Sequence, residues 1–426
     1  MSASTLQPGS KATRDVDLRE ADDGPDAGPV AAVLDAVRGL APLIATRAAE
    51  IEAARRLPLD LLDDLVAAGC FRMLRPASHG GLGLGLTSGM RVIEELSRAD
   101  ASVAWTVGIG SAGWLDLVDL PRATFDAILG ENPDAVVAGA VNPTGTAVPV
   151  DGGYRIDGRW AFASGCEHSD WMFANCIEQP AGGGGEDGPG DETSGDDGPP
   201  DGGPPPMRVA VVSPADVEIE DTWSVSGLRG TGSHHFRIDG VVVPADHTYA
   251  VMVAESCIDE PMARIPLPTP YTPLVAAMAI GAAQGALDDI LALATTKVPL
   301  FAGATLATDP LFQNRLASVD ARLRAARALV YGDAATVWRM AVAGEELPLE
   351  LRARIRADGV WAVDTAVSVV DTAYTAGGSS SLYDSSPLQR RLRDIHALTQ
   401  HFLVKADALT PVGAVLAGQD VDIPFL

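Results

Sequence analysis

The spacing of apolar residues changes twice along the chain, and this order of segments limits the possible folds more than any other feature. From about Pro29 to Pro133, apolar residues recur every three or four positions, which is typical of amphipathic helices. From residue 134 to about 250, short β-branched or aromatic runs stand between Gly, Pro and Asp, and they predict strands. Helical spacing returns after Pro261, where residues 309–330 predict a long bundle helix. We therefore expect helices, a small β-domain and a helical bundle, in that order.

Two low-complexity segments interrupt or precede this pattern. Residues 1–28 offer little apolar surface to offset the entropy of ordering, and they predict a disordered tail. Residues 179–206 are rich in Gly, Pro and acidic residues, and they predict a disordered insertion between two strands. The net charge of the whole chain is −26. The residues outside these two segments also carry a net negative charge. This charge argues against binding to nucleic acid or to an anionic membrane surface.

The cysteines and the N-terminus indicate the cellular compartment. Cys70, Cys166, Cys176 and Cys257 have neither the spacing of metal ligands nor the density of a disulfide framework, so we expect reduced thiols and no metal site. The first residues have no apolar core of the kind found in signal peptides. No run approaches the roughly 18 apolar residues that are needed to span a bilayer. The sequence therefore predicts a soluble, cytoplasmic protein.

The stretch from Gly377 to Phe402 combines a Gly-Gly turn, a run of hydroxyl residues and a helical pattern that begins after Pro387. On that predicted helix His401 lies opposite the apolar stripe, and His396 lies near its edge. The residues expected in the stripe are Leu388, Leu392, Ile395, Thr399 and Phe402, and those expected beside His401 are Arg390 and Asp394.

This stretch resembles the last segment of the acyl-CoA dehydrogenase fold. In many dehydrogenases of that family, the residue after the position matching His401 is the catalytic glutamate. Here that residue is Phe402, which cannot accept a proton. The pattern with histidine in place of the acid looks like the flavin-dependent monooxygenases built on the same fold, the group D oxygenase components of two-component hydroxylases.

The resemblance covers about residues 29–420 and implies an α+β, mostly α fold. We expect an N-terminal helical domain at 29–133 and a middle β-barrel or sandwich domain at 134–250. A C-terminal four-helix bundle is expected at 251–426. Family likeness also implies an oligomer, with a homotetramer as the expectation.

Several segments match flavin-binding positions of the family. By resemblance, Trp160 would pack near the isoalloxazine, and Ser164 would place a hydroxyl or backbone N–H near N5. The alternative is that Trp160 is a core residue and Ser164 a turn residue without a role in flavin binding. Glycines and hydroxyls at 226–233 suggest a pyrophosphate cradle. The adjacent His234 and His235 must point to opposite faces of a strand, so both cannot act in one site. The other predicted cofactor residues are Asn142 in a turn beside the ring, Arg229, Thr231 and Ser233 near phosphates or substrate, Gly377 and Gly378, and Phe312 and Gln313 reaching a neighbouring subunit's flavin.

The resemblance also suggests the substrate pocket and leaves the flavin open. Residues 100–115 look like the helix at the floor of the pocket, with Trp105 and Ser111 as candidates, though a plain core helix fits equally well. Phe402 is a third pocket candidate. The family's usual Arg-x-x-Phe-Gly is altered to TKVPLFAG, with Lys297 as the nearest basic residue, so both FAD and FMN remain possible.

The predicted function is that of an oxygenase supplied with reduced FAD or FMN by a separate NAD(P)H-dependent reductase. Oxygen would form a C4a-hydroperoxyflavin that hydroxylates a small aromatic substrate. A histidine near neutral pKa can accept a phenolic proton, so His401 is the first candidate for the base and His396 the second. A surface histidine paired with Asp394 is the bland alternative. An acyl-CoA dehydrogenase, an N- or S-oxygenase, or a binding protein without turnover are the other functions considered.

Overall fold

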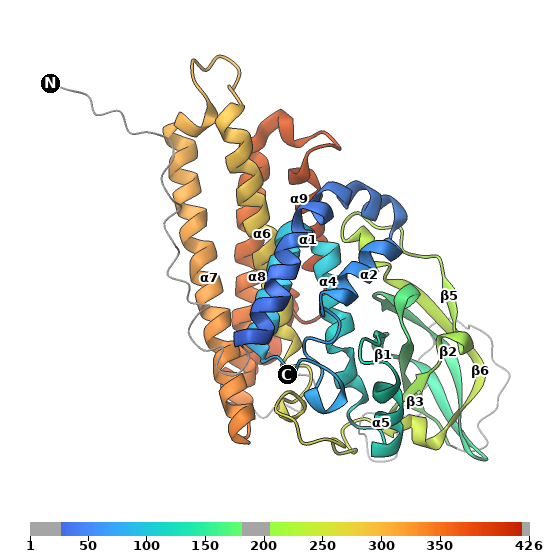
Figure 1. The fold of residues 1–426 in the computed structure, drawn as a ribbon. Helices are drawn as coiled ribbons and strands as arrows, with labels where there is room; N and C mark the ends of the chain where they lie inside the picture. The colour runs from blue at the N-terminus through green and yellow to red at the C-terminus, as the bar shows by residue number, and fades with distance from the viewer. Residues whose placement is uncertain (1–26, 181–204, 420–426) are drawn as a thin grey trace, which may run out of the picture.

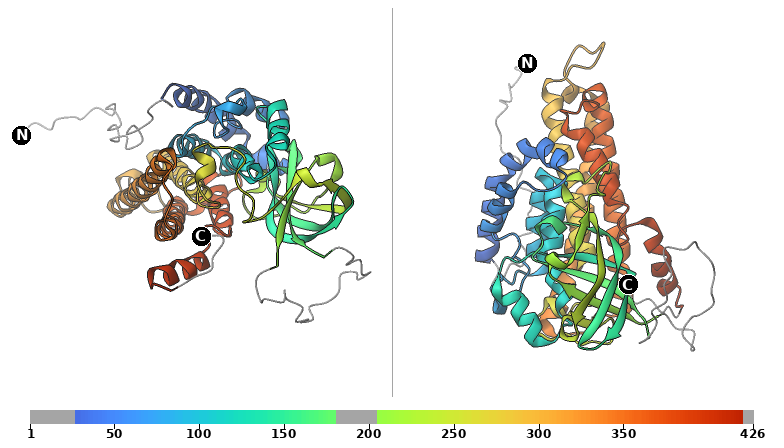
Figure 2. Two further views of the ribbon diagram at one scale, coloured as in Figure 1. Left: turned by 90° about the horizontal axis from the view of Figure 1, so that it is seen from below. Right: turned by 90° about the vertical axis from the view of Figure 1, so that its right-hand side faces the viewer.

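The computed structural model describes residues 27–180 and 205–419. All but the last two residues of the predicted N-terminal tail, and nearly all of the predicted insertion, lie outside the described residues. Figure 1 shows helices from the first part of the chain between a sheet and a group of long helices from the last part. Seen from below, the sheet curls into a barrel-like body on one side of the helices (Figure 2).

The first helices form the layer between the sheet and the bundle. An Asp at residue 100 caps the fourth of them, because its carboxylate accepts the backbone N–H groups of residues 102 and 103. This layer comprises α1 (Ala27–Ala54), α2 (Leu59–Ala67), α3 (Leu86–Ala99), α4 (Ala101–Ala112) and α5 (Arg122–Glu131).

The middle part forms a seven-stranded sheet in the order β5-β6-β2-β1-β3-β4-β7. Within it β1 runs parallel to β3, and the other neighbouring pairs are antiparallel. The strands are β1 (Val137–Val150), β2 (Gly153–Ala163), β3 (Trp171–Glu178), β4 (Met207–Val212), β5 (Glu218–Glu220), β6 (His234–Pro244) and β7 (Thr248–Ala250).

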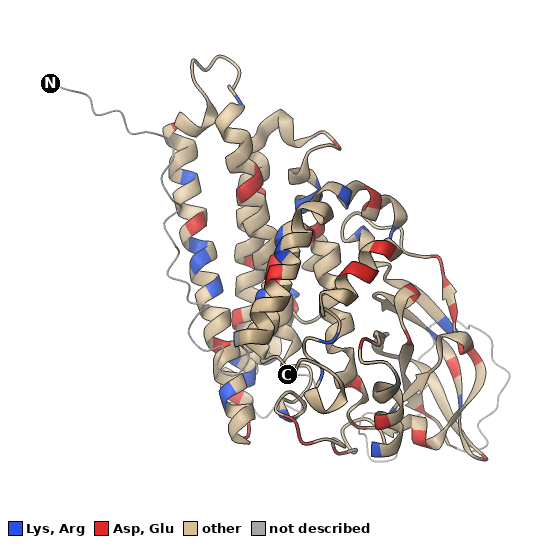
Figure 3. Ribbon diagram, in the orientation of Figure 1, with Lys and Arg blue, Asp and Glu red and all other residues tan. Residues whose placement is uncertain are grey.

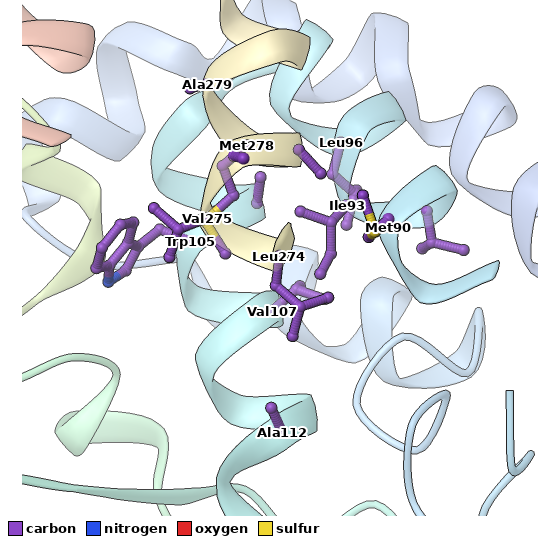
Figure 4. Packing of buried hydrophobic residues seen from close by; sticks show 14 of the residues in the cluster. Met90, Ile93, Leu96, Trp105, Val107, Ala112, Leu274, Val275, Met278 and Ala279 are labelled. Atoms are coloured by element: carbon purple, nitrogen blue, oxygen red, sulfur yellow. The ribbon is translucent and has the colours of Figure 1, made fainter. Parts of the chain in front are cut away.

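The last part is helical, and its longest helices pack side by side. The apolar helix α6 contacts both α3 and α8, so it links the bundle to the N-terminal layer. Figure 4 shows this contact, with Leu274 and Met278 of α6 among Met90, Ile93 and Leu96 of α3. The helices are α6 (Tyr271–Thr296), α7 (Pro310–Ala343), α8 (Leu349–Gly377), α9 (Pro387–Leu398) and α10 (Leu409–Leu416).

Two local expectations are wrong. Helix α9 ends at Leu398, because the following amides bond three residues back and tighten the chain into turns, so His401 and Phe402 lie beyond the helix. Asn142 does not lie in a turn between strands. Instead β1 is continuous, and its pairing with β3 shifts register between Ala140 and Gly145 because residues bulge out there.

Two helices in the described part of the chain are long and apolar enough to cross a membrane by length and composition, contrary to expectation. One of them, α6, has most of its apolar stretch buried among other helices, as the core helix of a bundle does. The other is α1, near the N-terminus. Figure 3 shows basic and acidic residues interspersed along α1 and α7 in this view.

Candidate active site

A chain of hydrogen bonds joins three of the segments singled out in the sequence. Trp105 Nε1 of α4 donates to Ser164 Oγ, just after β2, at 2.9 Å. Ser164 Oγ lies 2.8 Å from Ser233 Oγ, and Ser233 Oγ lies 2.7 Å from Thr231 Oγ1. Thr231 Oγ1 donates to the carbonyl oxygen of Leu228 at 2.9 Å. Four predicted site residues therefore form one continuous structure, which we call the hydroxyl chain (Trp105, Ser164, Ser233, Thr231).

His401 lies against the first member of this chain. Its ring meets Trp105 edge to face, with centroids 5.1 Å apart, and the ring of Phe402 is 4.8 Å away on another side. Trp105 itself is almost fully buried, and Figure 4 shows it on the side of α4 and α6 turned away from Met90. The structure thus brings together His401, Trp105 and Phe402, as expected.

The surroundings of His401 keep its imidazole neutral. Desolvation by neighbouring side chains, and then the positive charge of Arg356 on α8, lower its pKa from 6.5 to about 4. At neutral pH the ring therefore has a lone pair that can accept a proton. This is the protonation state that a general base requires, but a pKa of about 4 makes the ring a weaker base than the near-neutral histidine expected from the sequence.

Helix α9 fixes the loop that leads into the hydroxyl chain. Asp394 is 2% exposed and accepts the backbone N–H of Leu228 at 2.7 Å. Arg393 forms a two-pronged ion pair with Glu52 of α1 and donates to the carbonyl of Ser226. Because Leu228 has a positive φ of 52°, an unusual conformation for a leucine, these contacts hold a turn that the residue alone would not favour.

The neighbouring residues of α9 tie it to two further elements. Arg390 faces the α4 cap Asp100 across 3.6 Å, and Arg391 pairs with Asp289 of α6. Burial, together with the nearby charge of Asp100, raises the pKa of Asp394 to about 7. Four charged residues in about one helical turn (390, 391, 393, 394) thus connect α9 to α4, α6, α1 and the 226–231 loop.

Trp160 does not reach the site, and that prediction is wrong. Its side chain is fully buried, stacks on Phe236 with centroids 5.1 Å apart, and donates to the carbonyl of Asn175. It belongs to the core of the sheet, which was the alternative considered.

The sequence reasoning missed Phe162, two residues after Trp160. The register between β2 and β6 shifts between Trp160 and Ala163, and Phe162 has φ +68°. This bulge turns the Phe162 side chain out of the sheet, where it is 62% exposed and contacts Trp223 and His235 edge to face. A bulge leaves no clear signal in one sequence. The only hint was an aromatic residue two positions before a serine-glycine turn.

Other polar groups near this end of the sheet remain available to a ligand. Asn142 is exposed in the bulge of β1, and Thr144 in the same bulge donates to the carbonyl of Arg159 in β2. Antiparallel pairing therefore brings the bulge beside the end of β2. Within the described chain, Arg229 Nε and His235 Nδ1 are buried without a hydrogen-bond partner. Such groups cost free energy, so a ligand acceptor at Arg229 would be favourable.

Thr231 and Ser233 do not form the expected pyrophosphate cradle. Both are almost fully buried, and both hydroxyls are already bonded within the chain. Ser111 is also misassigned as a pocket residue, since it is fully buried and donates to the carbonyl of Gly108 in its own helix. The hydrogen of its hydroxyl is therefore bonded within its own helix.

His396 is a surface residue, and its assignment as a second catalytic base is wrong. Its side chain is about half exposed, and Nε2 lies 3.0 Å from Asp371 of α8, not near Asp394. Asp371 in turn lines a groove of about 530 Å³ between α7 and α8. That groove is formed by residues other than those of the hydroxyl chain.

The remaining predicted residues lie at the ends of the bundle helices. Phe312 is only 6% exposed, so it packs in the core of its own bundle and cannot reach a neighbouring subunit. Gln313 is exposed and donates to the carbonyl of residue 307. Gly377 and Gly378 end α8, where Lys297 Nζ donates to the carbonyl of Gly377 and Gly378 adopts φ +53°. A cofactor role for Gln313 and the two glycines stays a prediction.

Comparison with known proteins places this geometry in context. Residues 31–118 match the model of the acyl-CoA dehydrogenase N-terminal domain, and residues 274–406 match that of the C-terminal domain. An indole-3-acetate monooxygenase from Pseudomonas putida is 31% identical over 91% of this chain and 93% of its own length. The oxygenase subunit HsaA of a flavin-dependent monooxygenase from Rhodococcus jostii is 30% identical over 85% and 92%. Among solved structures, XiaF from a Streptomyces species in complex with FADH2 and glycerol superposes with a TM-score of 0.85 at 26% identity, covering 94% of this chain and 99% of XiaF.

Proposed function

Because the chain belongs to the flavin-dependent monooxygenases of the acyl-CoA dehydrogenase fold, we propose that it hydroxylates a small aromatic substrate with His401 as the base. The protein is a reduced-flavin-dependent monooxygenase and the oxygenase component of a two-component system, so a separate reductase supplies its flavin. The family, the mostly α fold and the flavin requirement expected from the sequence are confirmed.

One observation carries the proposal: a neutral, half-buried His401 lies against Trp105 at the start of the hydroxyl chain. A neutral imidazole accepts the proton of a phenol or related group, which makes the aromatic ring more nucleophilic. Trp105 and Phe402 give the substrate an apolar and aromatic surrounding. His401 therefore orients the substrate and removes its proton.

The chain's residues also fit a flavin. Phe162 presents an exposed aromatic face, which suits stacking on a planar ring. Ser164 adds a hydroxyl beside it, and the buried Arg229 Nε offers an unused donor for an anionic or polar edge. When bound, the reduced flavin supplies the two electrons with which O2 delivers one oxygen atom to the substrate and releases the other as water.

The organisation of the protein belongs to the same proposal. We assign domains to residues 29–133, 134–250 and 251–426, a homotetramer as the assembly and the cytoplasm as the location. The indole-3-acetate monooxygenase supports an aromatic substrate class, and the hydroxylation of ring carbon fits a histidine base best.

The test is oxygen incorporation by the purified protein with reduced FAD or FMN and oxygen-18-labelled O2. Indole-3-acetate and a series of phenols serve as substrates, with product mass read by mass spectrometry. We expect a labelled hydroxyl in the product, and a loss of about 10²–10⁴ in turnover for His401→Ala. The matched control His396→Ala should keep full turnover, because that histidine is on the surface.

Two results would contradict the proposal. Unlabelled or absent product with every aromatic compound, despite binding of reduced flavin, would exclude aromatic hydroxylation. Equal turnover in wild type and His401→Ala would exclude His401 as the base. Bleaching of a tightly held oxidised flavin by an acyl-CoA would instead indicate a dehydrogenase.

A further inference from the structure

The imidazole of His401 is held by packing more than by hydrogen bonds. His401 lies in the turns after α9, where its backbone carbonyl accepts the N–H groups of Val404 and Lys405. Within the described residues, its ring nitrogens make one hydrogen-bond contact, in which Nδ1 lies 3.5 Å from the backbone N of Leu403. That distance is at the long limit for a hydrogen bond. The orientation of the ring therefore depends on the side chains around it.

Two aromatic side chains contact this ring, and one of them is much better fixed than the other. Phe402 is 44% exposed and is the next residue in the same turn, so it moves together with His401. Trp105 is 6% exposed and comes from the regular helix α4. The imidazole meets the indole edge to face at 74°, an arrangement whose stabilisation depends on the angle between the two ring planes. The plane of the indole thus decides how the imidazole is held.

One hydrogen bond fixes the plane of the Trp105 indole. The indole N–H can only donate, and it donates to Ser164 Oγ at 2.9 Å. Its direction therefore does not depend on how the other hydroxyl groups nearby are oriented. Ser164 follows β2 directly, and its hydroxyl lies 2.8 Å from that of Ser233 at the start of β6. The bond thus anchors a side chain of α4 to the sheet.

We propose that Trp105, anchored by Ser164, is a positioning residue that holds the imidazole of His401 in the orientation in which it acts as the base. This inference rests on the proposed function, in which His401 is that base. Trp105 carries no proton in the reaction and acts on it through His401. The base comes from the segment after α9, the wall that orients it from α4, and the anchor of that wall from the sheet.

Two substitutions break the anchor from opposite sides. Ser164→Ala removes the acceptor and keeps the indole, whereas Trp105→Phe keeps an aromatic ring and removes the N–H. Either change should let the ring beside His401 turn, because the loss of one hydrogen bond changes such an equilibrium by about fivefold. Ser164→Thr keeps the hydroxyl and should behave as wild type. The double variant should match Trp105→Phe alone, because both changes break the same bond.

The first measurement is made on the full chain without flavin or substrate. Diethyl pyrocarbonate modifies neutral imidazoles that it can reach, and peptide mass spectrometry gives the rate at each histidine. We expect His401 to be modified about fivefold faster in Ser164→Ala and in Trp105→Phe than in wild type. His396 is half exposed and serves as the internal reference, so its rate should not change.

Trp160→Phe is the matched control. Trp160 is also a buried tryptophan whose N–H donates to one acceptor, the carbonyl of Asn175, but it lies in the core of the sheet. Its replacement should lower the melting temperature and leave the modification rate of His401 at the wild-type value. A general loosening of the protein is thereby separated from the loss of the anchor.

The second measurement is steady-state turnover with reduced flavin and an aromatic substrate that wild type accepts. Ser164→Ala and Trp105→Phe should lower kcat about fivefold and change KM less, because the base is less often in place while the aromatic wall remains. Ser164→Thr should restore kcat, and Trp160→Phe should not lower it.

Two outcomes would overturn this inference and leave the proposed function standing. In the first, His401 is modified at the wild-type rate in both Ser164→Ala and Trp105→Phe, so the anchor does not hold the ring. In the second, modification is faster but kcat is unchanged, so the orientation given by Trp105 does not matter to the reaction. If wild type hydroxylates no aromatic substrate, the proposed function fails and this inference fails with it.

Discussion

Replacement of His401 by glutamine is expected to lower activity while making the protein more tolerant of acid. The imidazole is neutral at pH 7, because burial and Arg356 hold its pKa at about 4 instead of 6.5. In the unfolded chain the ring is hydrated and its pKa returns to about 6.5. Below that pH the unfolded state binds a proton that the folded state does not.

Proton binding to the unfolded state therefore lowers the free energy of unfolding as the pH falls. Stability from the neutral ring is present above the unfolded pKa and is lost as the pH falls from about 6.5 towards about 4. Between about pH 7.5 and pH 5, these two pKa values correspond to a loss of about 2 kcal/mol in the free energy of unfolding. Because the ring is partly exposed, we expect about 1 kcal/mol after solvent screening. Glutamine does not titrate, so the variant escapes this loss.

Urea unfolding of wild type and His401→Gln at both pH values measures the effect, with the slopes compared to check that the same transition is followed. The difference in unfolding free energy should move in favour of the variant by about 1 kcal/mol at the lower pH. In parallel, the kcat/KM of wild type should hold down to about pH 5 and fall towards the pKa of about 4. An acid limb near pH 6.5 in kcat/KM, together with a stability difference that does not vary with pH, would refute the account of a half-buried base with a lowered pKa.

Three further substitutions test other parts of the structure. Phe162→Ala should weaken the binding of reduced flavin by about tenfold in calorimetry, because an exposed aromatic face is lost. The melting temperature should change little. Unchanged affinity would show that Phe162 does not contact the flavin. Glu94→Ala should cost about 3–5 kcal/mol in urea unfolding, because it removes the carboxylate that pairs with the buried Arg327 at 2.9 Å, and a cost below about 1 kcal/mol would contradict this. His396→Ala should change stability by less than about 1 kcal/mol and leave kcat unaltered, because the ion pair of His396 with Asp371 is exposed. A large fall in kcat would show that His396 takes part in catalysis.

The segment types and several site residues could be predicted from the sequence because they depend on local spacing. Periodicity is a local property, so the order of helices, sheet and bundle was visible. Trp105, Ser164 and His401 were found through the motifs around them, and the structure brings them together. The end of α9 was placed too late, because an apolar stripe continues past the point where the backbone leaves the helix.

What could not be predicted depends on contacts between distant segments. Trp160 and Phe162 have the same parity in a strand, and only the bulge against β6 sends them to opposite environments. Thr231 and Ser233 were expected in a pyrophosphate cradle, but their hydroxyls bond to each other and to Ser164, a serine about 70 positions away in the chain. The apolar pattern of the helix would be the same whether Phe312 packed in the core of its own bundle or contacted a neighbouring subunit. Only the packing in the structure, where Phe312 is buried, distinguishes the two.

The four charged residues of α9 also determine when during synthesis the site can become complete. Their partners are at residues 52, 100, 228 and 289, whereas Asp394 is among the last 33 of 426 residues to be made. Until that residue leaves the ribosome, nothing from α9 accepts the Leu228 amide, and the strained turn next to the hydroxyl chain has no anchor there. The residues of the sheet and of the N-terminal helices are therefore made well before the α9 residues that complete the proposed flavin site. A chain that ends just short of α9 lacks this anchor, so its site stays incomplete.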